Sequence, residues 1–260
     1  RPPISTLFPY TTLFRSNGGA MFTSLANGGT NVIVRTFNPE LVMQAIANEK
    51  VTATLIVPTM IQMLVDHPSF PNYDLSSLKQ LMYGASPINE ALLKRAMKGL
   101  PNAEFHQLYG MTELSPLATH LPWEQHYSEA SAAKNRLRAC GRAAIGCEAR
   151  IVDNDHKPVP HGTVGEVAVR GQNVMMGYWE RPEETAKAVI DGWMHTGDGG
   201  YMDEEGYIYL VDRMKDMIIS GGENVYSIEV ENTITQHPAV AQCAVIGIPD
   251  PHWCETVHAF

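Results

Sequence analysis

Cysteine is scarce in this sequence, which contains four cysteines among 260 residues. Cys140, Cys147, Cys243 and Cys254 are scattered and include no CxxC pair. This spacing argues against a disulfide framework and against a zinc site of the paired-cysteine type. We interpret the four as reduced thiols, which predicts a cytoplasmic protein.

Positive charge and long apolar runs are also lacking. Nineteen Lys and Arg stand against 28 Asp and Glu, for a net charge of −9. This excess of negative charge gives no sign of a basic surface that would bind a nucleic acid or an anionic membrane. No apolar run approaches the length of a membrane-spanning helix, so we expect none. The remaining composition is that of an ordinary globular protein, long enough for one large domain or two smaller ones.

The first sixteen residues, Arg1–Ser16, do not resemble the rest. They lack the features of a signal peptide, because Pro9 interrupts the apolar part and Arg15 follows it. They resemble the translation of a common DNA-sequencing adapter and differ from it only at Ile4, through one base change. We therefore expect residues 1–16 to be an artefact that is either disordered or arbitrarily placed in the structure, and Asn17 not to be a native start.

From Asn17 to about Cys140, short apolar strands alternate with helices. One helix is predicted after Asn38, a suitable N-cap, with Pro39 at its first position and an apolar face of Leu41, Val42, Ala45 and Ile46. The other expected elements are a strand at Ala53–Val57, a helix at about Thr59–Val65, a strand ending near Tyr83, the helix "INEALLKRAMKG" with Gly99 just beyond it, and a strand ending near Leu108. This β-α-β-α-β order predicts right-handed crossovers and a parallel sheet.

The pattern changes after Cys140. The strings "CEARIVD", "GEVAVRG" and "GYIYLVD" predict a small antiparallel sheet, interrupted by the helix "RPEETAKAVI". A glycine turn, a helix from about Ser227 to Gln236 and a strand at Ala241–Ile248 then begin a new α+β unit. We expect residues 17–140, 141–213 and 214–260 to form three successive parts.

Two loops follow strands of the predicted parallel sheet, where ligands of such sheets bind. They are "GASP" (Gly84–Pro87) and "YGMTE" (Tyr109–Glu113). For either loop alone, a tight turn that merely uses glycine is an equally good explanation.

Five strings occur in an order and at a spacing that resemble the adenylate-forming (AMP-binding) superfamily: "LYGMTE", "GEVAVRG", "HTGD", "DRMKD" and "GGENVYSIEVE". Within it, the resemblance is to acyl-CoA synthetases and fatty-acid–CoA ligases, and it covers the chain from Asn17 to Phe260. It implies an α/β fold, with a parallel half-sheet of the large domain, a small antiparallel β-subdomain and the start of a mobile α+β C-terminal domain.

The resemblance also implies an acid–thiol ligase. Such enzymes use ATP and Mg²⁺ to convert a carboxylic acid to an acyl-adenylate, releasing pyrophosphate. The thiol of coenzyme A then attacks, which gives the acyl-CoA and AMP. The expected partners are therefore the acid, ATP and coenzyme A, without a nucleic acid.

The resemblance assigns roles to residues of both loops. Tyr109 would provide a flat wall for adenine, beside Gly110. Thr112 would donate to the α-phosphate and Glu113 would hold Mg²⁺, which makes these two the catalytic candidates. Further positions near adenine and the acyl group are Gly84, Ala85, Ser86, Gln107 and Leu108. The plainer alternatives are a helix start for Thr112 and Glu113 and a buried strand for Gln107 and Leu108.

Later motifs supply the remaining assignments. Asp198 would accept hydrogen bonds from both ribose hydroxyls, with Arg213 as a second ribose contact. Lys215 resembles the hinge about which the C-terminal domain rotates, although an ordinary surface lysine would look the same. The loop of Gly221 and Gly222 would approach coenzyme A, and it is also a turn. His195 receives no catalytic role.

Three positions depart from the family pattern. Ile219 stands where aromatic-acid ligases often carry lysine, which favours an aliphatic acid. Ser227 stands where many relatives have proline, an exchange expected to change little. Cys254 replaces the usual glycine of "WGE", which puts the local turn in doubt.

Two family elements have no counterpart here: the Ser/Thr/Gly-rich phosphate loop and the C-terminal lysine of a Gly-Lys pair. We expect them upstream and downstream of a fragment that lacks both ends and has little adenylation activity alone. Two alternatives remain open: an adenylation domain that loads a carrier-protein thiol, and a truncated, non-catalytic nucleotide-binding protein. Chain length of the acid and oligomeric state are unknown.

Overall fold

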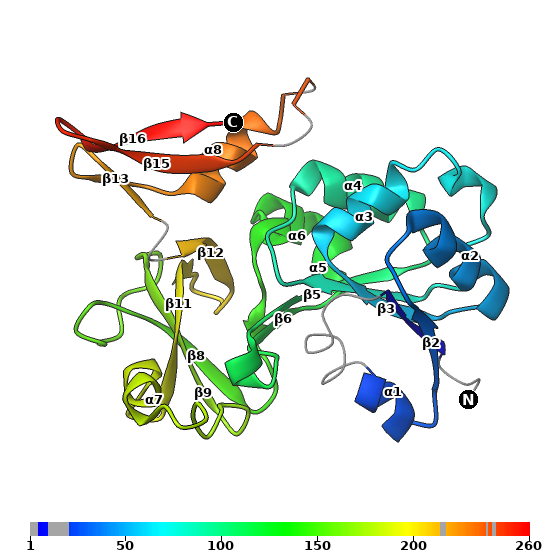
Figure 1. The fold of residues 1–260 in the computed structure, drawn as a ribbon, viewed down its shortest axis with the longest axis horizontal. Coiled ribbons are helices and arrows are strands. Elements are labelled where there is room, and N and C mark those ends of the chain that lie inside the picture. The colour runs from blue at the N-terminus through cyan, green and yellow to red at the C-terminus, as the bar shows by residue number, and fades with distance from the viewer. Residues whose placement is uncertain (1–4, 10–20, 214–216, 238, 241–242) are drawn as a thin grey trace. The chain divides into compact units, whose positions relative to one another are not determined.

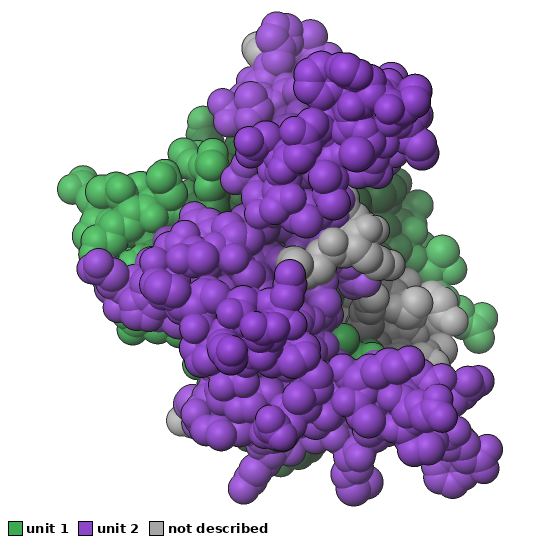
Figure 2. Space-filling view, turned by 90° about the vertical axis from the view of Figure 1, so that its left-hand side faces the viewer, with its two compact units in different colours: residues 1–144 green, residues 145–260 purple. Residues whose placement is uncertain are grey.

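The computed structural model describes residues 5–9, 21–213, 217–237, 239–240 and 243–260 (Figure 1). The chain divides into two compact units, residues 1–144 and 145–260, which Figure 2 colours separately. Each unit is built around its own β-sheets, and each is described by itself below.

The first unit contains a mixed sheet in the order β2-β1-β3-β4-β5-β6-β7. Neighbouring strands are parallel from β2 to β5, whereas β6 and β7 are antiparallel to their neighbours. The strands are β1 (Ser5–Pro9), β2 (Thr30–Val34), β3 (Ala53–Ile56), β4 (Gln80–Gly84), β5 (Glu104–Tyr109), β6 (Thr119–Leu121) and β7 (Arg142–Ala143). The predicted parallel sheet is confirmed, with β3, β4 and β5 adjacent.

Strand β1 belongs to the opening segment that we expected to be disordered or arbitrarily placed. It pairs in parallel with both β2 and β3, with Leu7 opposite Val32 on one side and Thr54 on the other. Ser5–Pro9 is thus placed as a strand of the sheet, because an extended backbone can complete the ladders of two neighbours whatever its origin. The origin of the segment stays a prediction, and residues 1–4 and 10–16 lie outside the described residues.

Three helices cover one face of this sheet: α2 (Pro39–Glu49), α3 (Pro58–Val65) and α4 (Glu90–Gly99) (Figure 1). Their buried side chains share one apolar core with Leu81, Tyr83 and Phe105 of the strands. The shorter elements are α1 (Phe22–Ala26), α5 (Glu124–Tyr127), α6 (Glu129–Ala133) and three 3₁₀ turns, η2 (Phe70–Asn72), η3 (Thr112–Leu114) and η4 (Arg136–Arg138).

The start of α2 is confirmed, and its predicted face is partly wrong. Asn38 Oδ1 accepts a hydrogen bond from Leu41 N at 3.1 Å, as expected of an N-cap. Val42, Met43 and Ile46 are buried, whereas Leu41 remains 50% exposed. Helical periodicity alone leaves the rotation of the helix open by about one position, and packing against the sheet fixes it. Similarly, Gly99 is the last residue of α4 and does not lie beyond it.

The second unit begins with an antiparallel sheet in the order β10-β11-β9-β8, and β12 also pairs with β11, along Asp198–Met202. The elements are β8 (Cys147–Val152), β9 (Gly165–Gly171), α7 (Pro182–Ala188), β10 (Val189–Ile190), β11 (Trp193–Met202) and β12 (Ile208–Arg213). The three predicted strands and the predicted helix are confirmed. Sequence reasoning missed β11, because the glycines of "HTGDGG" break its alternating pattern.

The last part of this unit is a second sheet in the order β14-β13-β16-β15. Its elements are β13 (Ile218–Ser220), β14 (Glu223–Val225), α8 (Ser227–Ile234), β15 (Val245–Asp250) and β16 (Cys254–Ala259). The expected α+β arrangement is present, with β13, β14 and β16 not foreseen. Among the described residues, every helix is too short or too polar to span a membrane.

Ser227 makes contacts that proline could not. Its backbone N–H and its Oγ both donate to Asp212 Oδ2, at 2.8 and 2.7 Å. Asp212 is buried, and it also accepts from the backbone N–H of Arg213 at 2.8 Å. The expectation that serine and proline are interchangeable here therefore omits two hydrogen bonds.

Candidate functional site: paired loops and a clamped aspartate

The loop after β4 follows Gly84, where the close approach of strand β5 leaves no room for a side chain. Gly84 pairs with Leu108 of β5, and a Cβ on Gly84 would lie 2.0 Å from the Leu108 carbonyl oxygen. Ala85 then adopts a left-handed backbone with φ +68°, which turns the chain sharply. Ala85 and Ser86 are exposed at the carboxyl end of the strand, where the family resemblance places them beside a ligand.

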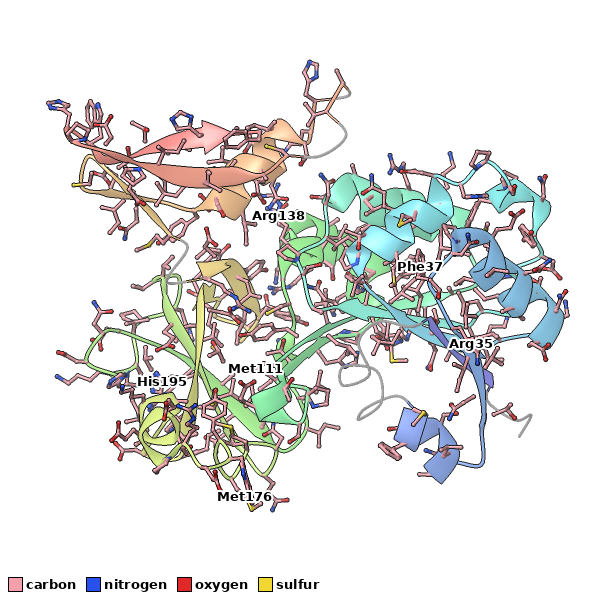
Figure 3. The ribbon with its side chains drawn as sticks, viewed as in Figure 1. Arg35, Phe37, Met111, Arg138, Met176 and His195 are labelled. Atoms are coloured by element: carbon pink, nitrogen blue, oxygen red, sulfur yellow. The ribbon has the colours of Figure 1, made fainter. Side chains whose placement is uncertain are left out.

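The loop after β5 folds back tightly on itself. Tyr109 O accepts from Ala118 N at 2.8 Å, and a Cβ on Gly110 would lie 2.0 Å from the Pro116 carbonyl oxygen. Met111, labelled in Figure 3, precedes the short turn η3, whose Leu114 is fully buried. The buried leucine fixes a turn on which Thr112 is exposed and Glu113 half-buried.

The register places these two loops side by side, because β4 and β5 are adjacent and parallel. Their predicted juxtaposition is therefore present in the first unit. Gln107, Leu108 and Tyr109 are all half-buried, so each side chain keeps some surface accessible to a ligand.

A polar contact beneath these loops was not foreseen from the sequence. The buried Tyr83 hydroxyl lies 2.8 Å from His126 Nε2 and 3.4 Å from Gln107 Oε1. Burial lowers the pKa of His126 to about 4 and raises the pKa of Tyr83 far above its ordinary value. Both groups are therefore neutral at pH 7, and the Tyr83 hydroxyl is the one that contacts the Gln107 side chain.

Asp198 and Arg213 form a pair in the second unit. They lie opposite one another on β11 and β12, with Arg213 Nε 3.5 Å from Asp198 Oδ1. The Asp198 side chain is 18% exposed and that of Arg213 is 62% exposed. A carboxylate that is partly accessible and beside a cation remains an acceptor for ligand hydroxyl groups. The structure thus brings together two residues that the resemblance assigns to one ribose.

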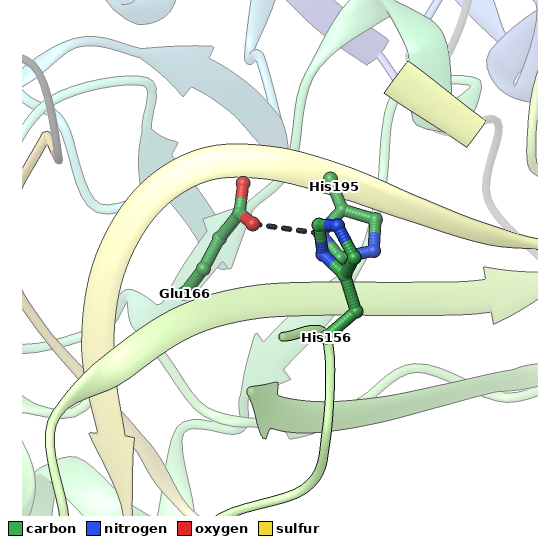
Figure 4. A group of neighbouring side chains, drawn as sticks. All are labelled: His156, Glu166 and His195. Atoms are coloured by element: carbon green, nitrogen blue, oxygen red, sulfur yellow. Dashed lines mark hydrogen bonds and ion pairs between the residues drawn. The ribbon is translucent and has the colours of Figure 1, made fainter. Parts of the chain in front are cut away.

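His195 is buried in the same strand, and its Nδ1 lies 2.6 Å from Glu166 Oε2 of β9 (Figure 4). His156 completes a group whose possible metal-ligating atoms all lie within 4.8 Å of one another, the one such group among the described residues. Sequence reasoning left Glu166 and His156 unassigned. The glutamate lies in the "GEVAVRG" string, which was interpreted as a strand and as one of the five family motifs, with no role given to this residue.

Gly221 contacts the turn that contains Cys254. Its N–H donates to Trp253 O at 2.9 Å, its φ is +61°, and a Cβ would lie 2.8 Å from the Trp253 ring. Gly222 also has a positive φ, of +86°. Both glycines are therefore required by a turn. Lys215, the predicted hinge residue, lies outside the described residues.

The doubt about the "HWCE" turn has a structural basis. Cys254 has φ +66°, a conformation that suits glycine better than cysteine. The turn nevertheless forms, because Asp250 Oδ1 accepts from the backbone N–H groups of His252 and Trp253, each at 2.8 Å.

The sequence profile of the AMP-binding enzymes matches residues 6–179, and that of the AMP-binding enzyme C-terminal domain matches residues 229–260. The chain belongs to the AMP-binding enzyme family. The resemblance of the five motifs and the predicted fold class are thereby confirmed.

Three similar proteins illustrate the family. A medium/long-chain-fatty-acid–CoA ligase, FadD8 of Mycobacterium tuberculosis, is 40% identical over 99% of this chain and 44% of its own length. A feruloyl-CoA synthase of an Amycolatopsis species is 43% identical over 92% of this chain and 47% of its own. The o-succinylbenzoate–CoA synthetase of Bacillus subtilis, solved with ATP and magnesium, shares 31% identity and a TM-score of 0.85 over 100% of this chain and 51% of its own.

This chain therefore spans about half the length of these relatives. Their names show that the acid varies within the family, from fatty acids to ferulate.

Proposed function

We propose that the protein containing this chain activates a carboxylic acid with ATP to an acyl-adenylate and transfers the acyl group to coenzyme A. The observation that carries the proposal is the pair of loops after β4 and β5, which adjacent parallel strands place side by side. Both depend on glycines at close backbone contacts, Gly84 and Gly110, where a Cβ would meet a backbone carbonyl oxygen.

The described residues suit the groups that this reaction handles. Half-buried Tyr109 offers a ring face for adenine, and the exposed Thr112 hydroxyl can donate to a phosphate oxygen. Glu113 offers carboxylate oxygens on a turn fixed by buried Leu114, which fits a hard cation such as Mg²⁺. When bound, Mg²⁺ offsets the charge of the phosphates.

In the second unit, we assign Asp198 and Arg213 to the ribose. The carboxylate of Asp198 accepts from the two hydroxyl groups, while Arg213 lies beside that carboxylate and contributes donors of its own. We assign Gly221 and Gly222 to the approach of coenzyme A and Lys215 to the hinge. The four free cysteines support a cytoplasmic location.

For the acid, we propose an aliphatic chain such as that of a fatty acid. The support is Ile219 on β13, an apolar residue where aromatic-acid ligases often carry lysine, together with similarity to a fatty-acid–CoA ligase. A feruloyl-CoA synthase of comparable identity makes aromatic acids the alternative to test.

The test needs protein from the intact gene that encodes this sequence. ATP–pyrophosphate exchange is measured with straight-chain fatty acids of increasing length and, in parallel, with benzoate, ferulate and indoleacetate. We expect exchange with the fatty acids and, on addition of coenzyme A, the matching acyl-CoA by mass spectrometry. Exchange only with aromatic acids contradicts the substrate proposal, and no exchange with any acid contradicts the reaction.

The same assay separates the alternatives. An adenylation domain for a carrier protein would show exchange, would form no acyl-CoA, and would load a holo-carrier protein. A non-catalytic nucleotide-binding protein would bind ATP without exchange.

A further inference from the structure

The strand that carries Asp198 bulges at the "HTGD" motif. His195 of β11 pairs with Ala168 of β9, and Gly199 pairs with Glu166. From His195 to Gly199 the chain advances four residues along β11, whereas from Ala168 to Glu166 it spans only two residues of β9. Strand β11 therefore contains two extra residues at this point. Asp198 lies on this bulge, and its position depends on whatever fixes the bulge.

Glu166 holds the bulge through hydrogen bonds to the residues before and after Thr196, which are His195 and Gly197. Its Oε2 lies 2.6 Å from His195 Nδ1 (Figure 4). Its Oε1 accepts from Gly197 N at 2.8 Å. A carboxylate only accepts, so the first contact places a proton on His195 Nδ1. The His195 side chain is 6% exposed and that of Glu166 is 21% exposed, so water competes little for the bond between them.

Thr196 completes the attachment of the bulge to β9. Its Oγ1 donates to Val167 O at 2.8 Å and accepts from Asp198 N at 3.1 Å. The three residues that precede Asp198 are thus each bonded to Glu166 or Val167. The backbone N–H of Asp198 itself is held through Thr196.

We propose that Glu166 is a positioning residue for the nucleotide: it holds the bulge so that the Asp198 carboxylate meets the ribose hydroxyl groups. This inference rests on the proposed function, since it takes the ribose as the partner of Asp198. Glu166 touches no ligand in this scheme. The two carboxylate oxygens of Glu166 set the direction in which the Asp198 side chain points from β11. Arg213 lies beside Asp198 on the neighbouring strand β12.

Glutamine in place of Glu166 keeps the size and one acceptor. It cannot accept from both His195 Nδ1–H and Gly197 N–H through two separate oxygens, because its second terminal group is an amide donor. The change therefore removes one of the two hydrogen bonds that Glu166 accepts, with little change in side-chain volume. Glu148→Gln is the matched control, because Glu148 is an exposed glutamate of neighbouring β8 that pairs with Arg170 at 2.7 Å.

The experiment measures AMP and 2′-deoxy-AMP binding by calorimetry, using protein from the intact gene. We expect the wild type and Glu148→Gln to bind AMP more tightly than 2′-deoxy-AMP. Glu166→Gln should weaken AMP about tenfold, the effect of losing one charge-assisted contact, and should weaken 2′-deoxy-AMP less, because that nucleotide has only one of the two hydroxyl groups that Asp198 accepts from. Equal loss for both nucleotides, or no loss for either, overturns the proposal.

Two further arms keep the result decisive. If Glu166→Gln does not fold, as judged by circular dichroism, Thr196→Val removes the acceptor of Asp198 N and should give the same selective loss. A metal ion held by His156, Glu166 and His195 is the competing explanation. Treatment of the wild type with EDTA would then reproduce the loss for AMP, and that outcome also overturns the proposal.

Failure of the proposed function appears differently. Protein that discriminates AMP from 2′-deoxy-AMP but shows no ATP–pyrophosphate exchange contradicts the reaction and leaves the Glu166 result valid. Wild-type protein that exchanges but does not distinguish the two nucleotides overturns the role of Glu166 and retains the reaction.

Discussion

At the residue scale, Asp198 is the position whose chemistry can be tested most directly. Its carboxylate is partly accessible beside Arg213, so its loss should remove two hydrogen bonds to a charged acceptor. We expect Asp198→Ala to raise the Michaelis constant for ATP by at least about a hundredfold, since each of the two bonds contributes about 1.5–3 kcal/mol and tenfold corresponds to about 1.4 kcal/mol. Initial-rate kinetics of pyrophosphate exchange measure the change.

The control for this variant is Asp155→Ala, which removes an exposed aspartate that pairs with Lys157 at 3.7 Å. It should leave the Michaelis constant for ATP unchanged. Circular dichroism should show that both variants are folded. An unchanged constant in folded Asp198→Ala would remove Asp198 from the nucleotide site.

Cys254 permits a test of backbone strain. Its φ of +66° is unfavourable for a side chain with a Cβ, so Cys254→Gly should raise the free energy of unfolding by roughly 0.5–1 kcal/mol. Cys147→Gly, within strand β8, should instead lower it by a similar amount. Urea denaturation measures both, and a destabilised Cys254→Gly would show that the cysteine side chain stabilises this turn.

At the element scale, α2 shows how a local signal fixes a helix end. Asn38→Ala removes the acceptor for Leu41 N and should lower the free energy of unfolding by about 1 kcal/mol. Asn38→Ser should retain most of the stability, because serine also caps helices. Asn102→Ala, in an exposed turn, is the control. Equal stability of the Asn38→Ala and Asn38→Ser variants would contradict the cap.

The elements with strong periodicity were predictable, and those with weak local signals were not. Strands β3, β4 and β5 and helices α2, α3 and α4 follow from apolar spacing and caps. Strand β11 escaped because its glycines interrupt the alternation, although neighbours on both sides complete its pairing. Strand β16 forms through its ladder with β15, which sequence spacing does not reveal.

At the scale of the whole molecule, burial of His126 predicts a dependence of stability on pH. Its pKa is lowered from 6.5 to about 4 because burial disfavours the charged ring. The unfolded chain therefore binds a proton between pH 6.5 and 4 that the folded chain does not. The contribution of His126 to the free energy of unfolding is fully present above pH 6.5, and it decreases by about 3 kcal/mol as the pH falls to 4.

Urea denaturation at pH 7.5, 6 and 5 measures this fall. His106 and His120 contribute with the same sign, because burial also lowers the pKa of each. His126→Gln should flatten the dependence, whereas His161→Gln, an exposed histidine, should not. An equally steep fall in His126→Gln would show that other groups cause it.

By itself, the sequence determined the family, the order of the main strands and helices from β3 to β5 and the residues of the two loops, because motifs and caps act within a few neighbouring positions. The tertiary structure alone decided which residues meet. His195 and Glu166 are 29 positions apart, and Tyr83 and His126 are 43 apart. Strand register and burial bring the two residues of each pair within hydrogen-bonding distance. No pattern of neighbouring residues in the sequence predicts either pair.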